Sequence, residues 1–473
     1  MDSQYDWRNN PRRHIMTATR IEKDSMGELK VPVDALYAAQ TQRAVNNFPI
    51  SGQAMPKTFI QALLLAKYAA AEANGELGLI PEKMASSICQ AVDSLLEQDF
   101  MQHFPVDVYQ TGSGTSSNMN ANEVLASLAS EIYGDTVGAN DHINYGQSSN
   151  DIIPSAIHIS AALALENKLL PGLNHLVNAI RKKALSVDKY IKTGRTHLMD
   201  AMPVRMSQSL NAWADQIEQQ IVHLKQLQPS VQSLAQGGTA VGTGINTVAD
   251  FAGIFNQKLT KKTAIEFTPA KNFFTHIGSQ DIAVSLSGQL KATAVSIMKI
   301  ANDLRWMNSG PMAGLGEIEL KALQPGSSIM PGKVNPVIPE AAAMVATQVI
   351  GNDTTITIAG QSGNFELNVM LPLIAKNLLE SIELLTNVSH LLADKAIATF
   401  IVREENLLAV LAKNPILVTA LNPIIGYAKA AEIAKLAYKE NRPIIEVAEE
   451  NTELKREELE RLLDPAKLTE GGV

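Results

Sequence analysis

Apolar residues recur every three or four positions along much of the chain, which is the spacing of one face of an α-helix. Between residues 57 and 102 the repeated positions are Phe59, Leu63, Leu64, Tyr68, Ile88, Val92 and Leu95. A longer stripe, typical of a helix that continues past residue 300, consists of Leu290, Ala294, Ile297, Met298, Ala301 and Leu304. The alternation of period two that marks a strand is nearly absent. The pattern therefore predicts a bundle of long helices with few sheets.

Polar stretches rich in Gly, Pro, Ser, Thr or Asn interrupt this helical pattern. They span residues 111–122, 138–151, 194–202, 236–247 and 324–339. Loops held on a rigid scaffold often carry binding and catalytic side chains. We therefore look for the chemistry of the protein in these stretches.

The same pattern divides the chain into predicted domains of an all-α fold. We expect an N-terminal helical domain at 20–145, a central long-helix bundle at 146–402 and a small C-terminal helical domain at 403–473. In the last of these, the helical units are short and are broken by Pro415, Pro423 and Pro443. Residues 1–19 are polar and are expected to form a disordered N-terminal extension.

The composition excludes several classes of protein. Of 473 residues, 45% are apolar and 19% are charged, as in soluble globular proteins. A formal net charge of -8 disfavours nucleic acid as a partner. Cys89 is the single cysteine, so the chain has neither an internal disulfide nor the thiolates for an iron–sulfur cluster. No apolar run reaches about 18 residues, so we expect no membrane span, no secretory signal and a cytoplasmic location.

Two Gly-rich segments fail the tests for nucleotide-binding loops. In GSSIMPGK, residues 326–333, five residues separate the glycines instead of four, and Val334 stands where a P-loop needs Ser or Thr. GGTAVGTG, residues 237–244, has no lysine and follows no predicted strand. None of the nine histidines forms an H-E-x-x-H motif or a close pair on one helical face. The chemistry is therefore expected to need no cofactor and no metal.

The polar stretches are dense in hydroxyl and amide side chains. They include TGSGT at 111–115, QSSN at 147–150, GRTH at 194–197 and GSSIMPGKVNP at 326–336. With Arg195, His197 and Lys333 they supply many hydrogen-bond donors, which a small dicarboxylate requires. Any one of them taken alone is also explained as a turn or a helix cap.

Taken together, these segments resemble the fumarase/aspartase superfamily and, within it, the class II, iron-independent fumarases. GSSIMPGKVNP is similar to the superfamily signature, and TGSGT, GRTHL and SGNFELNV (362–369) are similar to fumarase segments. The resemblance extends from about residue 20 to beyond residue 421. His197 and Gly332 stand where aspartases typically carry glutamine and alanine, which favours fumarase, whereas NDTT at 352–355 is more aspartase-like.

The resemblance implies reversible hydration of fumarate to L-malate through an aci-carboxylate intermediate, a step of the tricarboxylic acid cycle. It implies Ser327 as the base, His197 with Glu340 as the acid or proton relay, and Lys333 and Asn335 as a carboxylate clamp. The other substrate-binding residues would be Ser113, Thr115, Ser148, Ser149, Asn150 and Thr196. A serine acts as a base only if positive charge and hydrogen bonds stabilise its alkoxide, so the alternative role of Ser327 is substrate binding alone.

The resemblance also implies a three-domain fold whose long helices assemble into a tetrameric multi-helix core, with each active site shared by three subunits of a homotetramer. A second dicarboxylate site of the family usually contains His-Pro-Asn-Asp. This chain reads GAND at 138–141 and keeps only Asn140 and Asp141. Two other functions stay open, namely an aspartate ammonia-lyase of the same superfamily and a helical oligomer without catalytic activity.

Overall fold

The computed structural model describes residues 18–471, and helices make up most of them. The described residues form seventeen α-helices and five sheets, and each sheet has only two strands. The prediction of an all-α fold is confirmed. The predicted N-terminal extension lies outside the described residues, apart from Ala18 and Thr19.

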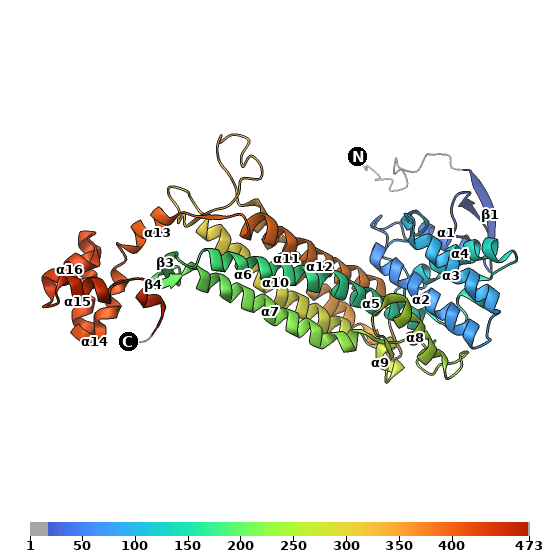
Figure 1. The fold of residues 1–473 in the computed structure, drawn as a ribbon. Coiled ribbons are helices and arrows are strands. Elements are labelled where there is room, and N and C mark those ends of the chain that lie inside the picture. Colours follow the sequence, from blue (N-terminus) through green and yellow to red (C-terminus); the bar gives the residue numbers. More distant parts are fainter. Residues whose placement is uncertain (1–17, 472–473) are drawn as a thin grey trace, which may run out of the picture. The chain divides into compact units, whose positions relative to one another are not determined.

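The described chain divides into two compact units, to which Figure 1 serves as a guide. The first unit contains residues 18–165, 227–287 and 352–380, and the second contains residues 166–226, 288–351 and 381–471. Four long helices contribute residues to both units: α7 (Met206–Val231), α10 (Asp281–Met307), α11 (Val337–Gly360) and α12 (Leu371–Leu391). The three domains expected from the sequence follow other boundaries and stay a prediction.

Helix α2 (Lys57–Glu76) is at the centre of the first unit. It packs against α3 (Glu82–Leu96), α5 (Ser149–Ala164) and α8 (Phe251–Thr263). The predicted apolar positions form these contacts, because Phe59, Leu63, Leu64, Ile88 and Val92 are all fully buried. The other elements of this unit include the hairpin of β1 (Thr19–Asp24) and β2 (Gly27–Pro32), α1 (Ala39–Asn47), α4 (Thr115–Tyr133), α9 (Phe273–Gly278), and the strand pairs β5 (Ser233–Leu234) with β6 (Thr268–Pro269) and β8 (Gly363–Asn364) with β9 (Leu367–Asn368).

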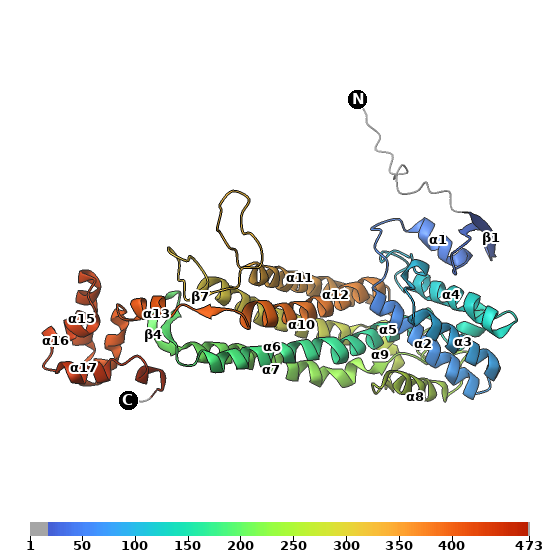
Figure 2. The same ribbon diagram turned by 45° about the horizontal axis from the view of Figure 1, so that its top comes forward.

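In the second unit, α6 (Leu170–Ser186) and the unit's portions of α7, α10, α11 and α12 run side by side as one bundle in both ribbon views (Figures 1 and 2). Trp213 of α7 donates from its indole N–H to Asp303 of α10 at 3.1 Å. The apolar stripe predicted past residue 300 faces this bundle. Its members Leu290, Ala294, Ile297, Ala301 and Leu304 are fully buried, and only Met298 is half-buried.

The rest of the second unit consists of short elements. They are the hairpin of β3 (Ile191–Thr196) and β4 (Met199–Arg205), the pair β7 (Ile318–Glu319) and β10 (Ile401–Val402), and the helices α13 (Glu404–Leu411), α14 (Asn422–Ile425), α15 (Tyr427–Glu440), α16 (Ile444–Asn451) and α17 (Arg456–Leu462). The last helices share a small apolar core that includes Leu421, Ile433, Val447 and Leu459. Among the described residues, no single helix meets the length and apolarity needed to cross a membrane, although the bent pair Glu404–Leu411 and Pro415–Ile425 passes that test together.

Candidate active site

The QSSN segment forms the start of α5, with Ser148 as the N-cap residue. The Ser148 hydroxyl accepts from the backbone N–H of Asn150 at 3.2 Å, and the Asp151 carboxylate accepts from the backbone N–H of Ser148 at 2.9 Å. These two bonds make a capping box that fixes the entry of the chain into the helix. Ser149 and Asn150 therefore lie in the first turn, where the helix dipole favours negative charge.

The TGSGT segment turns sharply into α4. Gly114 has a φ of 71°, and a Cβ there would lie 2.8 Å from Ile153 of α5, so this turn requires glycine. The turn places the hydroxyls of Ser113 and Thr115 at 2.8 Å from each other. Asn118, in the first turn of α4, donates to the Ser149 hydroxyl at 3.1 Å. The structure thus brings the two predicted binding segments of the first unit together.

A buried lysine lies behind these segments. Lys67 of α2 is fully buried, and its ammonium donates to Asn144 Oδ1 at 3.0 Å and to Gln147 Oε1 at 2.8 Å. Asn118 also donates to Asn144 Oδ1, at 3.2 Å, so one network joins α2, α4 and the QSSN segment. Burial lowers the pKa of Lys67 to about 7, and the charge of Asp151 opposes that shift.

Asp151 holds the Gly-rich stretch of residues 236–247 against the start of α5. Its buried carboxylate accepts from Gln236 Nε2 at 3.0 Å and from the backbone N–H groups of Gly237 and Thr239 at 3.1 and 2.9 Å. Burial raises the pKa of Asp151 to about 6, although these backbone donors favour the carboxylate. Neither Lys67 nor Asp151 was singled out from the sequence. The signal for Lys67 was a charged residue whose helical neighbours are apolar, and the signal for Asp151 was its position three residues after Ser148, as in a capping box.

In the second unit, GRTHL forms the turn of the β3–β4 hairpin. Thr196 pairs with Met199, and the two residues between them, His197 and Leu198, have φ of 55° and 61°. Glycine and asparagine adopt positive φ easily, whereas other residues in the left-handed region cost roughly 1–2 kcal/mol each. Thr196 and His197 are exposed at this turn. A strained, exposed histidine is a feature that clusters at functional sites.

Arg195, which the sequence grouped with the substrate donors, has a buried partner instead. Its guanidinium donates to Glu317 Oε1 at 2.6 Å, and the ammonium of Lys192 lies 3.3 Å from the same carboxylate. The Glu317 side chain is only 4% exposed. We therefore assign Arg195 the structural role of anchoring the hairpin that presents His197.

The signature segment GSSIMPGKVNP closes into a loop. The Gly326 N–H donates to the Lys333 carbonyl at 2.9 Å, and Asn335 Nδ2 donates to the Gly326 carbonyl at 2.6 Å. A Cβ on Gly326 would lie 2.2 Å from the Lys333 carbonyl oxygen, so the closure requires glycine. The Lys333 ammonium donates to Asn335 Oδ1 across the closed loop. The Ser327 hydroxyl accepts from the backbone N–H groups of Ile329 and Met330 at 3.3 and 3.1 Å.

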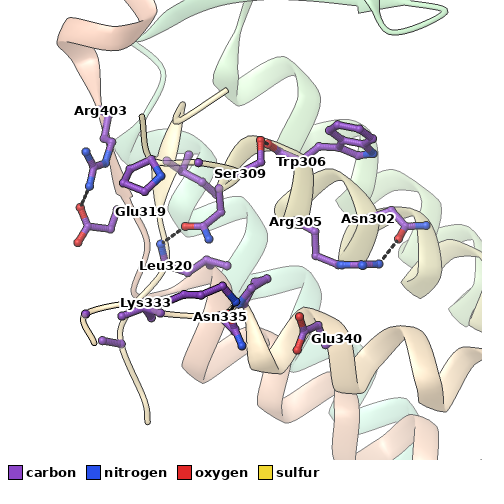
Figure 3. Close-up of a pocket in the computed structure, with 18 of the residues that line it drawn as sticks. Asn302, Arg305, Trp306, Ser309, Glu319, Leu320, Lys333, Asn335, Glu340 and Arg403 are labelled. Carbon is purple, nitrogen blue, oxygen red and sulfur yellow. Dashed lines mark hydrogen bonds and ion pairs between the residues drawn. The ribbon is translucent and has the colours of Figure 1, made fainter. Parts of the chain in front are cut away.

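An open cleft of about 1050 Å³ lies beside this loop. Figure 3 shows Lys333 and Asn335 on one side of it and Glu340, in the first turn of α11, next to them. Arg305, near the end of α10, and Arg403 add two further cations to the lining, and neither was predicted from the sequence. Ser327 lines a smaller hollow of about 430 Å³, which Lys333 also lines.

The predicted partners His197 and Glu340 are not brought together within one chain. Within residues 18–471, no hydrogen bond or ion pair links the His197 imidazole to the Glu340 carboxylate. The predicted residues instead fall into two sets, one in each unit. The first set is Ser113, Thr115, Ser148, Ser149 and Asn150, and the second is Thr196, His197, Ser327, Lys333, Asn335 and Glu340.

The candidate second site lies in the first unit. Asn140 and Asp141 belong to the π-helix Ala139–Ile143, and both are exposed. Its neighbour His142 accepts from the Gly138 N–H at Nδ1, at 2.8 Å, and so stabilises this turn. Asn140 lines a hollow of about 490 Å³ together with Arg20 and other charged side chains. Dicarboxylate binding here stays a prediction.

Comparison with known proteins identifies the family. The Lyase family matches residues 27–351, and the Fumarase C C-terminus family matches residues 417–470. "Fumarate hydratase class II 2" of Pseudomonas aeruginosa is 68% identical over 458 residues, which are 97% of this chain and 100% of that protein. The class II fumarate hydratase of Xylella fastidiosa is 59% identical over 454 residues, 96% of each chain. This chain belongs to the class II fumarate hydratase family.

The fold of this chain is also that of a class II fumarase. The crystal structure of a class II fumarase from Schistosoma mansoni matches with a TM-score of 0.93 at 38% identity, over 96% of this chain and 99% of that one. The predicted family, the all-α lyase fold and the enzyme class of hydro-lyase are confirmed, and the ammonia-lyase alternative is not favoured. The Lyase match contains every predicted catalytic and substrate-binding residue, but their individual roles stay predictions.

Proposed function

We propose that this chain catalyses the reversible hydration of fumarate to L-malate in the tricarboxylic acid cycle, by anti addition and elimination of water. The observation that carries this proposal is the full-length similarity to class II fumarate hydratases, in a chain whose signature loop holds Ser327, Lys333 and Asn335 together. The reaction needs a base for the C3 proton of malate, donors for the carboxylate that gains charge, and an acid for the leaving hydroxyl.

Ser327 is proposed as the base, and its surroundings support an ionised hydroxyl. Its Oγ accepts from two backbone N–H groups, those of Ile329 and Met330, which would remain in place as donors to an alkoxide. The Lys333 ammonium, on the same closed loop, adds positive charge. These features lower the free energy of the alkoxide relative to the alcohol, which is the change that base catalysis by serine requires.

Lys333 and Asn335 are proposed to clamp the carboxylate that becomes the aci-carboxylate. The lysine supplies charge, and the asparagine amide is already oriented by its bond to Gly326. His197 with Glu340 is proposed as the acid or proton relay. The hydroxyls and amides of Ser113, Thr115, Ser148, Ser149, Asn150 and Thr196 would orient the substrate.

We propose that these residues meet in a homotetramer in which three subunits share each site. Helices of the second unit carry exposed apolar residues that support an interface with other chains: Val222 on α7, Val295 on α10 and Met344 on α11 are 51%, 55% and 68% exposed. The opposite side of α11 is also apolar, because Ala342, Ala346 and Val349 are buried. Light scattering should give about 204 kDa, four times 51.0 kDa. The cytoplasmic location stays a prediction.

The test of the function is the ultraviolet absorbance of fumarate after purified protein is mixed with L-malate, with L-aspartate in parallel and a chelator present throughout. Fumarate formed from malate alone, at a rate the chelator does not change, is the expected result. Ser327→Ala should lower kcat by at least about 1000-fold if the serine is the base, because no other group then takes the proton. A loss confined to KM would assign Ser327 to binding alone, and fumarate from aspartate would contradict the proposal.

A further inference from the structure

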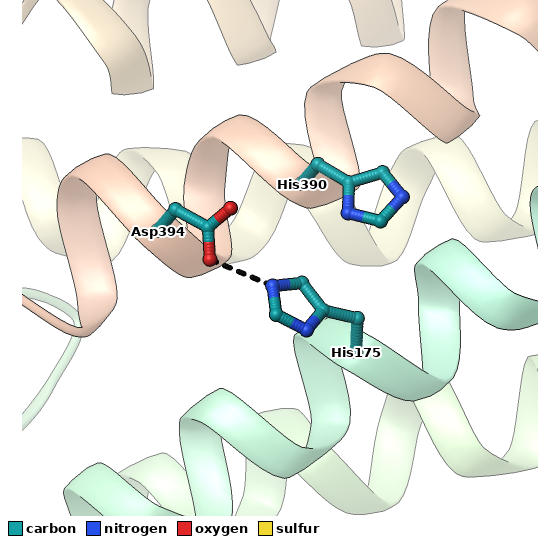
Figure 4. A group of neighbouring side chains, drawn as sticks. All are labelled: His175, His390 and Asp394. Atoms are coloured by element: carbon teal, nitrogen blue, oxygen red, sulfur yellow. Dashed lines mark hydrogen bonds and ion pairs between the residues drawn. The ribbon is translucent and has the colours of Figure 1, made fainter.

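Three potential metal ligands, none of which has been given a role above, meet on the surface of the second unit. His175 lies on α6, His390 lies in the last turn of α12, and Asp394 lies in the π-helix Leu392–Ile397 that follows. Figure 4 shows His175 and Asp394 facing each other from two helical segments and joined by a hydrogen bond, with the His390 ring beside them. One ligand atom from each lies within 4.8 Å of the others, and all three residues are exposed.

The backbone beneath the cluster is fixed by the protein core. The segment of α6 around His175 packs against the π-helix Leu392–Ile397. Leu173 and Leu176 on one side and Leu392 and Ala393 on the other are buried, so the two supports cannot separate without exposing apolar surface. π-helical turns within helices occur frequently at functional sites. The cluster thus consists of exposed side chains on backbone segments that are held by the core.

The distances suit a metal after small side-chain rotations. Ligand atoms about 2.0–2.1 Å from a tetrahedral ion are about 3.3 Å from one another. In the cluster, His175 Nε2 and Asp394 Oδ1 are 2.7 Å apart, held by a hydrogen bond, and the His175 and His390 ring centroids are 5.1 Å apart. Replacing the shared proton by an ion requires the first pair to move apart slightly and the His390 ring to turn inward. The exposure of all three side chains permits this movement.

We propose that His175, His390 and Asp394 bind one divalent transition-metal ion of the Zn²⁺ or Co²⁺ type, with water completing the coordination. Two imidazole nitrogens and one carboxylate oxygen are ligands that these ions prefer, whereas Mg²⁺ and Ca²⁺ prefer an all-oxygen set. The ion would link α6 to the segment after α12 and so stabilise the folded chain in proportion to its concentration. None of the three residues takes part in the proposed hydration chemistry.

The alternative interpretation is a surface ion pair between His175 and Asp394, with His390 nearby by chance. Exposed pairs of this kind contribute little to stability and take up no metal. The two interpretations differ in one measurable property, which is the stoichiometric binding of an ion that depends on all three residues.

The experiment titrates the chelator-treated full chain with CoCl₂, followed by the visible absorption of Co²⁺ and by calorimetry. The expected result is one ion per chain, a visible band typical of nitrogen and oxygen ligands at low coordination number, and no heat with MgCl₂. His175→Ala, His390→Ala and Asp394→Asn should each weaken binding by at least about tenfold, since each removes a direct ligand. His223→Ala, on α7, is the matched control and should bind like the parent.

Circular dichroism of the metal-free variants checks folding, which should be intact because all three side chains are exposed. Equal affinity in the parent, His175→Ala and His390→Ala would overturn the proposal, as would the absence of Co²⁺ binding at millimolar concentration. Half an ion per chain would also overturn it, because the ion would then bridge two chains. Fumarate formation assayed in parallel should be the same in all variants, so failure of the metal site is distinguishable from failure of the proposed function.

Discussion

Buried ionisable side chains hold the binding segments of the first unit in position. Lys67, Asp151 and His158 do not belong to any predicted substrate contact, yet each bonds to a segment that carries or supports one. Such groups are costly to bury unless their hydrogen bonds are satisfied, which makes the local geometry well defined. Substituting them should therefore lower activity, because the binding segments lose their position, and lower stability, because buried polar groups lose their hydrogen-bond partners.

Lys67→Met should reduce both stability and activity. The substitution leaves Gln147 Oε1 without its donor, removes one of several donors to Asn144 Oδ1 and removes the charge that faces Asp151. Together these losses should cost about 3 kcal/mol. The QSSN segment should then lose its fixed orientation, and kcat/KM should fall about tenfold or more. Urea denaturation and the fumarate assay measure the two effects. Lys83→Met, an exposed lysine on α3, should change neither, and equal behaviour of the two variants would remove Lys67 from this role.

His158 should make stability fall in mild acid. Its Nδ1–H donates to the Ser233 carbonyl at 2.9 Å, and burial, aided by the neighbouring His276, lowers its pKa from 6.5 to about 4. Between these two pKa values the His158 imidazole is protonated in the unfolded chain and neutral in the folded chain. The stabilisation is complete above pH 6.5 and is lost as the pH falls toward 4.

Between pH 7 and pH 5 this group alone should lower the free energy of unfolding by about 2 kcal/mol. His158→Gln keeps a donor but cannot titrate, so its urea midpoint should fall less over the same interval at equal protein concentration. Parallel pH profiles for the parent and the variant would show that His158 is not the group responsible.

At the scale of elements, the local sequence pattern predicted the helices. It did not predict contacts between residues that are far apart in the sequence. The stripe from Leu290 to Leu304 could be predicted because helix periodicity is a local property. The ion pair of Arg195 with Glu317 could not be predicted, since the two residues are 122 positions apart in the sequence. The His175 cluster shows the same limit, because His390 and Asp394 are four residues apart but His175 is contributed by another helix. Motifs such as GSSIMPGKVNP were found because all their residues lie in one loop.

The signature loop should depend on Gly326 more than on any other backbone position in it. In Gly326→Ala the new Cβ meets the Lys333 carbonyl, so the loop opens and Ser327, Lys333 and Asn335 lose their mutual positions. A displacement of about 1 Å at reacting groups costs roughly 100-fold in rate, which is the fall expected in kcat. The denaturation midpoint should hardly change, because the loop is largely exposed.

Gly253→Ala is the matched control for this loop. Gly253 lies on α8, where an added Cβ would have no atom within 4 Å, so the alanine should leave kcat unchanged and stabilise the helix by roughly 0.5–1 kcal/mol. A full rate in Gly326→Ala would contradict the closed loop as the active arrangement. An equal loss of stability in both glycine variants would contradict the assignment of the effect to the loop.

In the whole molecule, the residues predicted for the active site form two sets, one in each compact unit. All the residues assigned to substrate orientation except Thr196 lie in the first unit, whereas the base, the clamp and the proton relay are assigned to the second. The pair His197 and Glu340 is also not formed within one described chain. The proposed sharing of sites between subunits would account for both observations, because one chain would then supply the first set and another chain the second.

Two inactive variants should therefore restore activity to each other. Asn150→Ala removes a substrate-binding residue of the first unit, and Ser327→Ala removes the proposed base in the second unit. Every site in a tetramer of one variant alone therefore lacks one of these two residues. When the two are unfolded together and refolded, up to about a quarter of the sites should receive both sets intact, if subunits assort at random. The fumarate assay measures the recovery, and distinguishable tags on the two variants report that mixed tetramers formed. Mixed tetramers without recovered activity would mean that each site draws both sets from one chain, which would leave the exposed apolar residues of α7, α10 and α11 as an interface with no part in catalysis.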